Sequence, residues 1–212
     1  MSYSVKELFY TLQGEGAQTG RASVFCRFSG CNLWSGLEKD RHKTVCPFCD
    51  TDFVGIDGEG GAKFANAQQL TEAIICTWPS DTKGGKPYVV FTGGEPLLQL
   101  DKELIDCLHQ AGFEIAVETN GTIKAPEGID WLCVSPKQAD NLKQRSGNEL
   151  KLLFPLPELS PDQLSSLSFD HFFLQAIDED NNKKNIEQVI QYCMTHPQWR
   201  ISLQTHKLLG LK

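Results

Sequence analysis

One stretch of the chain reads Cys31-Asn-Leu-Trp-Ser-Gly-Leu-Glu-Lys-Asp-Arg-His-Lys-Thr-Val-Cys46-Pro-Phe-Cys49-Asp-Thr51 and holds three cysteines. Three thiolates can hold a four-iron cube and leave one iron without a protein ligand, where a small molecule can bind. With His42, the same cysteines could instead complete a closed zinc site. A redox-active dithiol at Cys46 and Cys49 is a weaker alternative. The local spacing favours neither iron–sulfur nor zinc over the other.

Composition limits the class of protein. The chain has 212 residues, of which 40% are hydrophobic and 22% charged, and this length suits one well-cored domain. A formal net charge of −7 argues against a nucleic-acid partner, since phosphate binding needs a basic face. No apolar run approaches the roughly 20 residues that cross a bilayer, and the N-terminus lacks the apolar segment of a secretory signal. We therefore expect a cytoplasmic protein with no membrane partner.

Eight cysteines in a reducing compartment are not expected to form a disulfide framework. The close trio therefore needs a metal or redox explanation. The other cysteines lie in apolar runs or stripes, and we expect them to be small buried side chains: Cys26, Cys76, Cys107, Cys133 and Cys193.

Strand-like and helix-like patterns alternate along the chain. Short runs rich in β-branched and aromatic residues predict seven strands, at 22–28, 87–91, 114–118, 131–135, 149–154, 171–175 and 200–204. Helical spacing of apolar residues predicts helices between several of them, around 70–77, 104–111 and 186–193. Asn66 and Gln69 resemble a capping box before the first helix, and Gly112 is suited to end the second.

This alternation implies parallel strands joined by crossover helices, in an open α/β sheet or a barrel. Seven strands are too few for a complete eight-stranded barrel. In both arrangements functional groups gather at the carboxyl ends of the strands. Four successive predicted strands end in polar segments: Thr92-Gly93-Gly94-Glu95-Pro96, Glu118-Thr119-Asn120-Gly121, Ser135-Pro136-Lys137 and Gln175-Ala176-Ile177-Asp178.

The segment that follows the strand at 87–91 has a distinctive composition. Gly93 and Gly94 expose the backbone to a ligand, and we expect the carboxylate of Glu95 to face an ammonium group. Two glycines in a row could also form only a tight turn. The segment becomes informative in combination with the three cysteines.

The cysteine motif, with the aromatic Phe48 before Cys49, and Gly93-Gly94-Glu95-Pro96 together resemble the radical S-adenosylmethionine (SAM) superfamily. In that superfamily, the amino and carboxylate groups of SAM chelate the open iron. The resemblance implies an incomplete TIM-type β/α barrel, formed by one domain over residues 1–212 with a cluster-binding loop at 31–50. A zinc site would leave the second motif unexplained.

Fourteen residues separate Cys31 from Cys46, where most of the superfamily has three. This insertion, with Thr11-Leu12-Gln13-Gly14-Glu15-Gly16 and Gln204-Thr205-His206-Lys207, resembles the 7-carboxy-7-deazaguanine synthases of queuosine biosynthesis, a tRNA modification pathway. The resemblance implies conversion of 6-carboxy-5,6,7,8-tetrahydropterin to 7-carboxy-7-deazaguanine with loss of ammonia, after a SAM-derived radical takes a hydrogen from C6. It also implies a reductant such as flavodoxin or ferredoxin, and a homodimer.

The resemblance further implies a site, residue by residue. Cys31, Cys46 and Cys49 ligate the 4Fe-4S cluster, and Thr51 offers its hydroxyl to Mg²⁺, a hard cation that prefers oxygen. No residue is expected to act as a general base in the hydrogen transfers, and none is assigned to the loss of ammonia. The SAM pocket is lined by Phe48, Cys49, Asp50, Gly94, Ser135, Pro136, Lys137, Gln175, Ala176, Ile177 and Asp178. The pterin is contacted by Leu12, Gln13, Gly14, Arg27, Thr92 and Lys212.

Two other functions stay open at this stage. A glycyl-radical-enzyme activase would share the cluster and SAM but act on a protein backbone, which would leave Arg27, Gln13 and Thr51 without a common purpose. A non-catalytic, zinc-stabilised binding module is the second. Arg27 could be a surface strand residue in an ion pair, and Thr51 could cap the turn after Cys49. Glu15 and Glu118 are further candidates for polar walls of the site.

Overall fold

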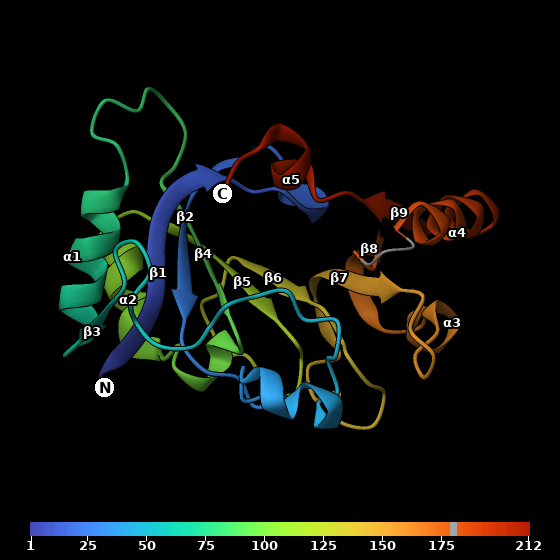
Figure 1. The fold of residues 1–212 in the computed structure, drawn as a ribbon. Coiled ribbons are helices and arrows are strands. Elements are labelled where there is room, and N and C mark those ends of the chain that lie inside the picture. Colours follow the sequence, from blue (N-terminus) through green and yellow to red (C-terminus); the bar gives the residue numbers. More distant parts are fainter. Residues whose placement is uncertain (179–181) are drawn as a thin grey trace.

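One sheet runs through the computed structural model, which describes residues 1–178 and 182–212, and the described strands have the order β3-β1-β2-β4-β5-β6-β7-β8-β9 (Figure 1). Seven strands of this order, from β2 to β9, are all parallel to one another. These are β2 (Ala22–Phe28), β4 (Tyr88–Gly93), β5 (Glu114–Thr119), β6 (Trp131–Val134), β7 (Ser146–Phe154), β8 (Ser168–Ala176) and β9 (Trp199–Ser202). Antiparallel pairing adds β1 (Tyr3–Leu12) and β3 (Ala62–Phe64) at one edge.

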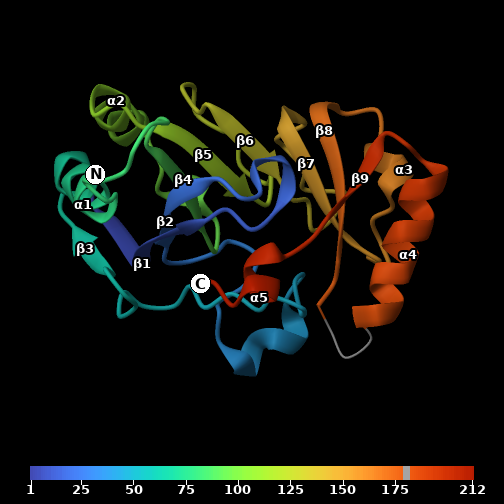
Figure 2. The same ribbon diagram turned by 90° about the horizontal axis from the view of Figure 1, so that it is seen from above.

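The helices lie mainly at the two ends of this curved sheet (Figure 2). At the β1 end are α1 (Ala67–Thr77) and α2 (Lys102–Gln110), and at the β9 end are α3 (Pro161–Leu164) and α4 (Asn182–Thr195). The short α5 (Thr205–Leu209) lies beside the end of β1 (Figure 1). Three 3-10 turns complete the described elements: η1 (Gly16–Gln18), η2 (Glu38–Lys43) and η3 (Pro96–Leu98). None of the described helices has the length and apolar character to cross a membrane.

All seven predicted strands correspond to the parallel strands of the sheet, and the three predicted helices correspond to α1, α2 and α4. The sequence pattern does not predict β1. A register shift between Val5 and Glu7 breaks the alternation of β1, so that Tyr3, Val5 and Leu8 all face the core. Strand β3 and helices α3 and α5 have five residues or fewer, too short for a periodic signal.

The predicted helix ends are largely confirmed. The Asn66 side chain accepts a hydrogen bond from the backbone N–H of Gln69 at 3.0 Å, as an N-cap should. The Gln69 side chain accepts from the N–H of Ala65 rather than from that of Asn66, so the capping box is not reciprocal. Gly112 follows α2 with φ of +83°, a conformation that favours glycine.

The expectation for the five cysteines outside the motif is wrong for Cys76. Cys26 and Cys133 are buried, and Cys107 and Cys193 are partly buried. Cys76 is exposed, because the buried face of α1 is formed by other positions: Ala67, Leu70, Thr71 and Ile74.

Asp101 joins α2 to the first strand. Its Oδ1 accepts from the backbone N–H of Leu104 at 3.0 Å and from the hydroxyl of the buried Tyr3 at 2.7 Å. The same carboxylate therefore caps α2 and satisfies a polar group in the core.

Asp101→Ala is expected to lower the free energy of unfolding by about 2–3 kcal/mol, because it removes a helix cap and leaves the Tyr3 hydroxyl unpaired. Urea titration followed by circular dichroism measures the loss. Asp106→Ala on the same helix is the matched control, since Asp106 pairs with Lys102 at the surface, and should cost less than about 0.5 kcal/mol. Equal losses for the two variants would contradict this role of Asp101.

Candidate active site

Two adjoining pockets lie at the carboxyl ends of the parallel strands. The cysteine pocket is lined by Cys31, Cys46 and Cys49 together with the ends of β4, β5 and β8. The β1 pocket is lined by the end of β1, by Arg27 and by Lys212. The two pockets share part of their walls, formed by Glu15, Asp50, Thr51, Thr92, Glu118 and Gln204.

The structure separates the predicted site residues between these pockets. Nearly all residues expected in the SAM pocket line the cysteine pocket: Phe48, Cys49, Asp50, Gly94, Ser135, Lys137, Gln175, Ala176, Ile177 and Asp178. Pro136 was also expected in the SAM pocket, but it is buried and does not line the cysteine pocket. All residues expected to contact the pterin line the β1 pocket: Leu12, Gln13, Gly14, Arg27, Thr92 and Lys212. Thr51, the expected Mg²⁺ ligand, lies in the shared wall.

The three thiols of the motif face one cavity, although fourteen residues separate the first from the second. Burial raises the pKa of Cys46 to about 11 and also raises the pKa of Cys31. His42 is exposed on η2 and lies outside the lining of this cavity. Among the described residues no three His, Cys, Asp or Glu side chains are grouped around the position of a single metal ion. The cysteines that line this cavity are soft sulfur donors, which fit an iron–sulfur cluster better than a mixed thiol–imidazole zinc site.

Gly93 and Gly94 let the end of β4 approach the start of the cysteine loop. A Cβ atom on Gly93 would collide with the carbonyl oxygen of Phe28, and one on Gly94 with that of Gly30. Gly93 also has φ of +134°, which side-chain-bearing residues rarely adopt. The glycines therefore bring two backbone segments together in addition to lining the pocket.

The carboxylate of Glu95 does not face a ligand site, in contrast to the sequence-based expectation. Glu95 is 0% exposed. Its Oε1 accepts from the N–H of Leu97 at 3.0 Å and from the hydroxyl of Thr119 at 2.7 Å, and its Oε2 accepts from the N–H of Asn120 at 2.8 Å. Because these donors come from β5 and η3, the carboxylate holds strand ends together.

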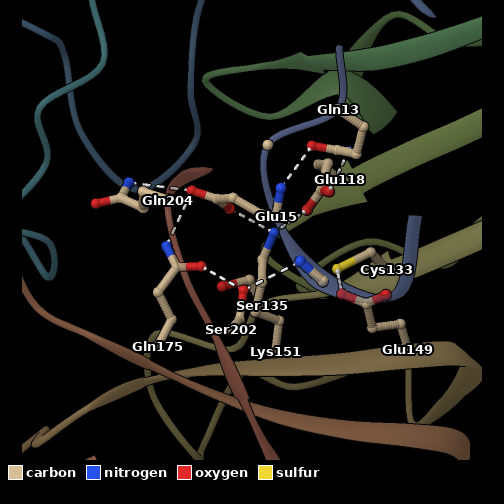
Figure 3. Close-up of polar contacts among 12 residues, drawn as sticks. Gln13, Glu15, Glu118, Cys133, Ser135, Glu149, Lys151, Gln175, Ser202 and Gln204 are labelled. Carbon is tan, nitrogen blue, oxygen red and sulfur yellow. Dashed lines mark hydrogen bonds and ion pairs between the residues drawn. The ribbon is translucent and has the colours of Figure 1, made fainter. Parts of the chain in front are cut away.

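Lys151 of β7 is the centre of an ionic cluster (Figure 3) whose members line the cysteine pocket. Its Nζ lies 2.7 Å from Oε2 of Glu15 and 2.8 Å from Oε2 of Glu118, and its side chain is 5% exposed. Surrounding carboxylates outweigh the effect of burial and hold the pKa of Lys151 well above its usual value. The ammonium group is therefore charged and paired with both carboxylates.

Glu15 receives further hydrogen bonds from the amides of Gln175 and Gln204, both at 3.0 Å to its Oε1 (Figure 3). Burial alone would raise its pKa, but the ion pair with Lys151 and these two amides hold the pKa at about 2. Glu15 thus stays ionised and links the loop after β1 to strands β7 and β8 and to the segment after β9.

Gln13 connects the cluster to the β1 pocket. Its Nε2 donates to Oε1 of Glu118 at 3.2 Å, and its Oε1 accepts from the N–H of Glu15 at the same distance. Glu15 and Glu118 line both pockets, as expected for polar walls. Sequence reasoning did not single out Lys151, and it quoted Gln204 without giving it a place in the site. A lysine within the apolar run of β7 was the available signal for the first, since buried lysines are rare unless paired.

Comparison with known proteins identifies the family. No family model matches the chain. A 7-carboxy-7-deazaguanine synthase from Caulobacter vibrioides is 58% identical, and one from Bordetella pertussis 57% identical, each over 100% of both chains. The chain belongs to the 7-carboxy-7-deazaguanine synthase family. A crystal structure of QueE from Escherichia coli superposes with a TM-score of 0.65 and 26% identity, covering 96% of this chain and 94% of that chain.

Because the chain belongs to the 7-carboxy-7-deazaguanine synthase family, it is neither a glycyl-radical-enzyme activase nor a zinc-stabilised binding module, the two alternatives that the sequence had left open. The match to these two relatives extends over the full length of the chain.

Arg27 forms an ion pair, as the alternative of a surface strand residue would require, but it also lines the β1 pocket. Its Nε donates to Oε1 of Glu7 at 2.7 Å, and its side chain is 20% exposed. The other oxygen of Glu7 lies 3.1 Å from Nζ of Lys212, and the carbonyl oxygen of Lys212 accepts from the hydroxyl of Thr11. Both the side chain and the main chain of Lys212 thus contact this edge of the pocket.

Lys151→Met is expected to lower the free energy of unfolding by about 3–5 kcal/mol, because it leaves two partly buried carboxylates without their cation. Adding Glu15→Gln and Glu118→Gln should recover a large part of the loss by removing those charges. Urea titration measures both effects. Lys63→Met on the exposed face of β3 is the control and should change stability by less than about 0.5 kcal/mol. A loss below about 1 kcal/mol for Lys151→Met would show that the cluster is not a stabilising centre.

Proposed function

We propose that this chain converts 6-carboxy-5,6,7,8-tetrahydropterin to 7-carboxy-7-deazaguanine, with loss of ammonia, as a radical SAM enzyme. Relatives named 7-carboxy-7-deazaguanine synthase are 53–58% identical to it over their full length. The observation that carries the proposal is the pair of adjoining pockets. One holds three thiols and the other a set of polar residues suited to a carboxylated ring, so two ligands can meet at the shared wall.

The cysteine pocket would hold the cluster and SAM. Cys31, Cys46 and Cys49 are soft donors that face one cavity and can leave one iron open. A bound and reduced cluster would supply the electron that cleaves SAM to the radical that takes hydrogen from the substrate. The protein contributes binding and orientation here: the Lys137 ammonium donates to the Ser135 hydroxyl at 2.7 Å, which fixes both at the end of β6.

The β1 pocket would hold the pterin. Gln13 is fixed by two hydrogen bonds, so its amide keeps one orientation toward the pocket. Arg27 uses Nε for Glu7, while its two terminal nitrogens, which have no partner among the described residues, can receive a substrate carboxylate. Thr92 and Gly14 complete the wall without adding charge.

Thr51 is the residue we propose as a ligand of Mg²⁺. Its hydroxyl has no hydrogen-bond partner within residues 1–178 and 182–212, and it lies in the wall common to both pockets. An ion there would meet one protein oxygen and keep positions for substrate oxygens and water, as Mg²⁺ usually does.

Three further proposals rest on the family. The curved sheet with its seven parallel strands supports an incomplete TIM-type barrel formed by one domain over residues 1–212. A cytoplasmic homodimer is proposed by analogy with the family. A flavodoxin or a ferredoxin is proposed as the reductant, because the cluster requires an electron for each radical that it generates.

Protein purified without oxygen and incubated with SAM, a reductant and the carboxypterin is expected to form 7-carboxy-7-deazaguanine, detected by mass spectrometry. Cys31→Ala, Cys46→Ala and Cys49→Ala should each lose bound iron and activity, because two thiolates hold the cube poorly. Cys107→Ala, remote from both pockets on α2, should retain both. Stoichiometric zinc without iron in the wild type would refute the proposal.

Thr51→Val should remove most of the increase in rate that added Mg²⁺ produces, because valine keeps the shape and lacks the oxygen. The rate is measured against Mg²⁺ concentration for both proteins. If Thr51 serves only to cap the turn after Cys49, the variant will lose stability while its surviving activity keeps the wild-type response to Mg²⁺.

A further inference from the structure

The C-terminal segment from Gln204 to Lys212 joins the walls of the two pockets. The N–H and the hydroxyl of Thr205 both donate to the carbonyl oxygen of Gly14 at 2.9 Å, which attaches α5 to the end of β1. A Cβ atom on Gly14 would collide with the ring of His206, so the two segments are in close contact. From this position α5 also reaches the cysteine pocket.

Lys207 makes that connection with one ammonium group. Its Nζ lies 2.9 Å from Oδ2 of Asp50 and 2.6 Å from Oδ2 of Asp178. Asp50 directly follows Cys49, and Asp178 follows the end of β8, yet both line the cysteine pocket. Lys207 itself lines the β1 pocket. One cation thus holds together three segments that are distant in the sequence.

Two carboxylates that share one cation repel each other when the cation is removed, because like charges in close proximity are unfavourable. The Lys207 side chain is 39% exposed, so each ion pair contributes little to global stability. Removing the Lys207 cation should therefore change the geometry of the pocket wall locally and leave global stability nearly unchanged. This distinguishes Lys207 from the buried Lys151.

We propose that Lys207 is a positioning residue that holds Asp50 and Asp178 in the wall of the cysteine pocket and thereby sets the affinity for SAM. The inference deepens the proposed function and rests on it, since it takes SAM to be the ligand of that pocket. Lys207 acts through the two aspartates and needs no contact with SAM.

Lys207→Met is expected to weaken SAM binding about threefold to tenfold at low salt, the effect of losing two partly exposed ion pairs. Equilibrium dialysis of anaerobically reconstituted protein with SAM measures the dissociation constant. Lys207→Arg should stay within about twofold of the wild type, because it keeps the cation. Lys102→Met, which removes the exposed ion pair with Asp106 on α2, is the matched control and should leave SAM affinity unchanged.

Salt provides a readout that a purely structural role would not change. Wild-type affinity for SAM should fall toward that of Lys207→Met as salt is raised, while the affinity of Lys207→Met changes less, because salt screens exposed ion pairs. Iron content and the urea midpoint of Lys207→Met should match the wild type. A fall in iron content that accounts for the lost binding would overturn the proposal.

A double-mutant cycle tests the route of the effect. Asp178→Asn should weaken SAM binding, and its effect should be smaller when introduced into Lys207→Met, because the partner is already missing. Unchanged or tighter SAM binding by Lys207→Met overturns the role of Lys207 while leaving the proposed function intact. Absence of SAM binding by the wild type and Lys102→Met overturns the proposed function and this assignment with it.

Discussion

The buried ammonium of Lys151 is the interaction on which the site depends. It projects from β7 and pairs with Glu118 at the end of β5 and with Glu15 in the loop after β1. Only β6 separates β5 from β7 in the sheet, whereas β1 lies near its other edge. A low-dielectric surrounding strengthens the attraction between the charges that these segments carry. Gln175 and Gln204 extend the same contacts to β8 and beyond β9. The cluster thereby fixes the floor against which both pockets are built.

A second constraint acts at the other wall. Gly93 and Gly94 permit backbone contact between the end of β4 and the start of the cysteine loop, and no larger residue fits there. Glu95 then ties this segment to β5 through Thr119 and the backbone of Asn120. A motif that invites a direct ligand-binding interpretation therefore also has a mechanical role, since it places the thiols opposite the strand ends. The carboxylate is satisfied inside the protein, as buried charges generally are.

The pockets are completed by segments that contribute little to the core. The C-terminal segment contacts Gly14, Asp50 and Asp178 through hydrogen bonds and partly exposed ion pairs. Such contacts are individually weak in water. They can control the shape of a ligand site without controlling the stability of the fold. Arg27 and Lys212 share Glu7 at the edge of the β1 pocket and so shape the ligand site. The apolar residues of α1 and α2 are buried in the core and stabilise the fold instead.

The sequence by itself determined the parallel strands and the long helices, because hydrophobic period and strand-end position depend on local spacing. The assignment of site residues to two ligands came instead from the resemblance to a known family, which local spacing does not supply. The sequence did not determine β1. A bulge between Val5 and Glu7 shifts the alternation of this strand, so that Val5 and Leu8 both face the core. Nor did the sequence determine the orientation of Glu95 or the central place of Lys151, since a charged side chain acquires partners only when distant segments meet. Those partners lie many positions away in the sequence. Only the tertiary structure, by bringing the strand ends and loops together, decided which charges would be buried, paired or left for a ligand.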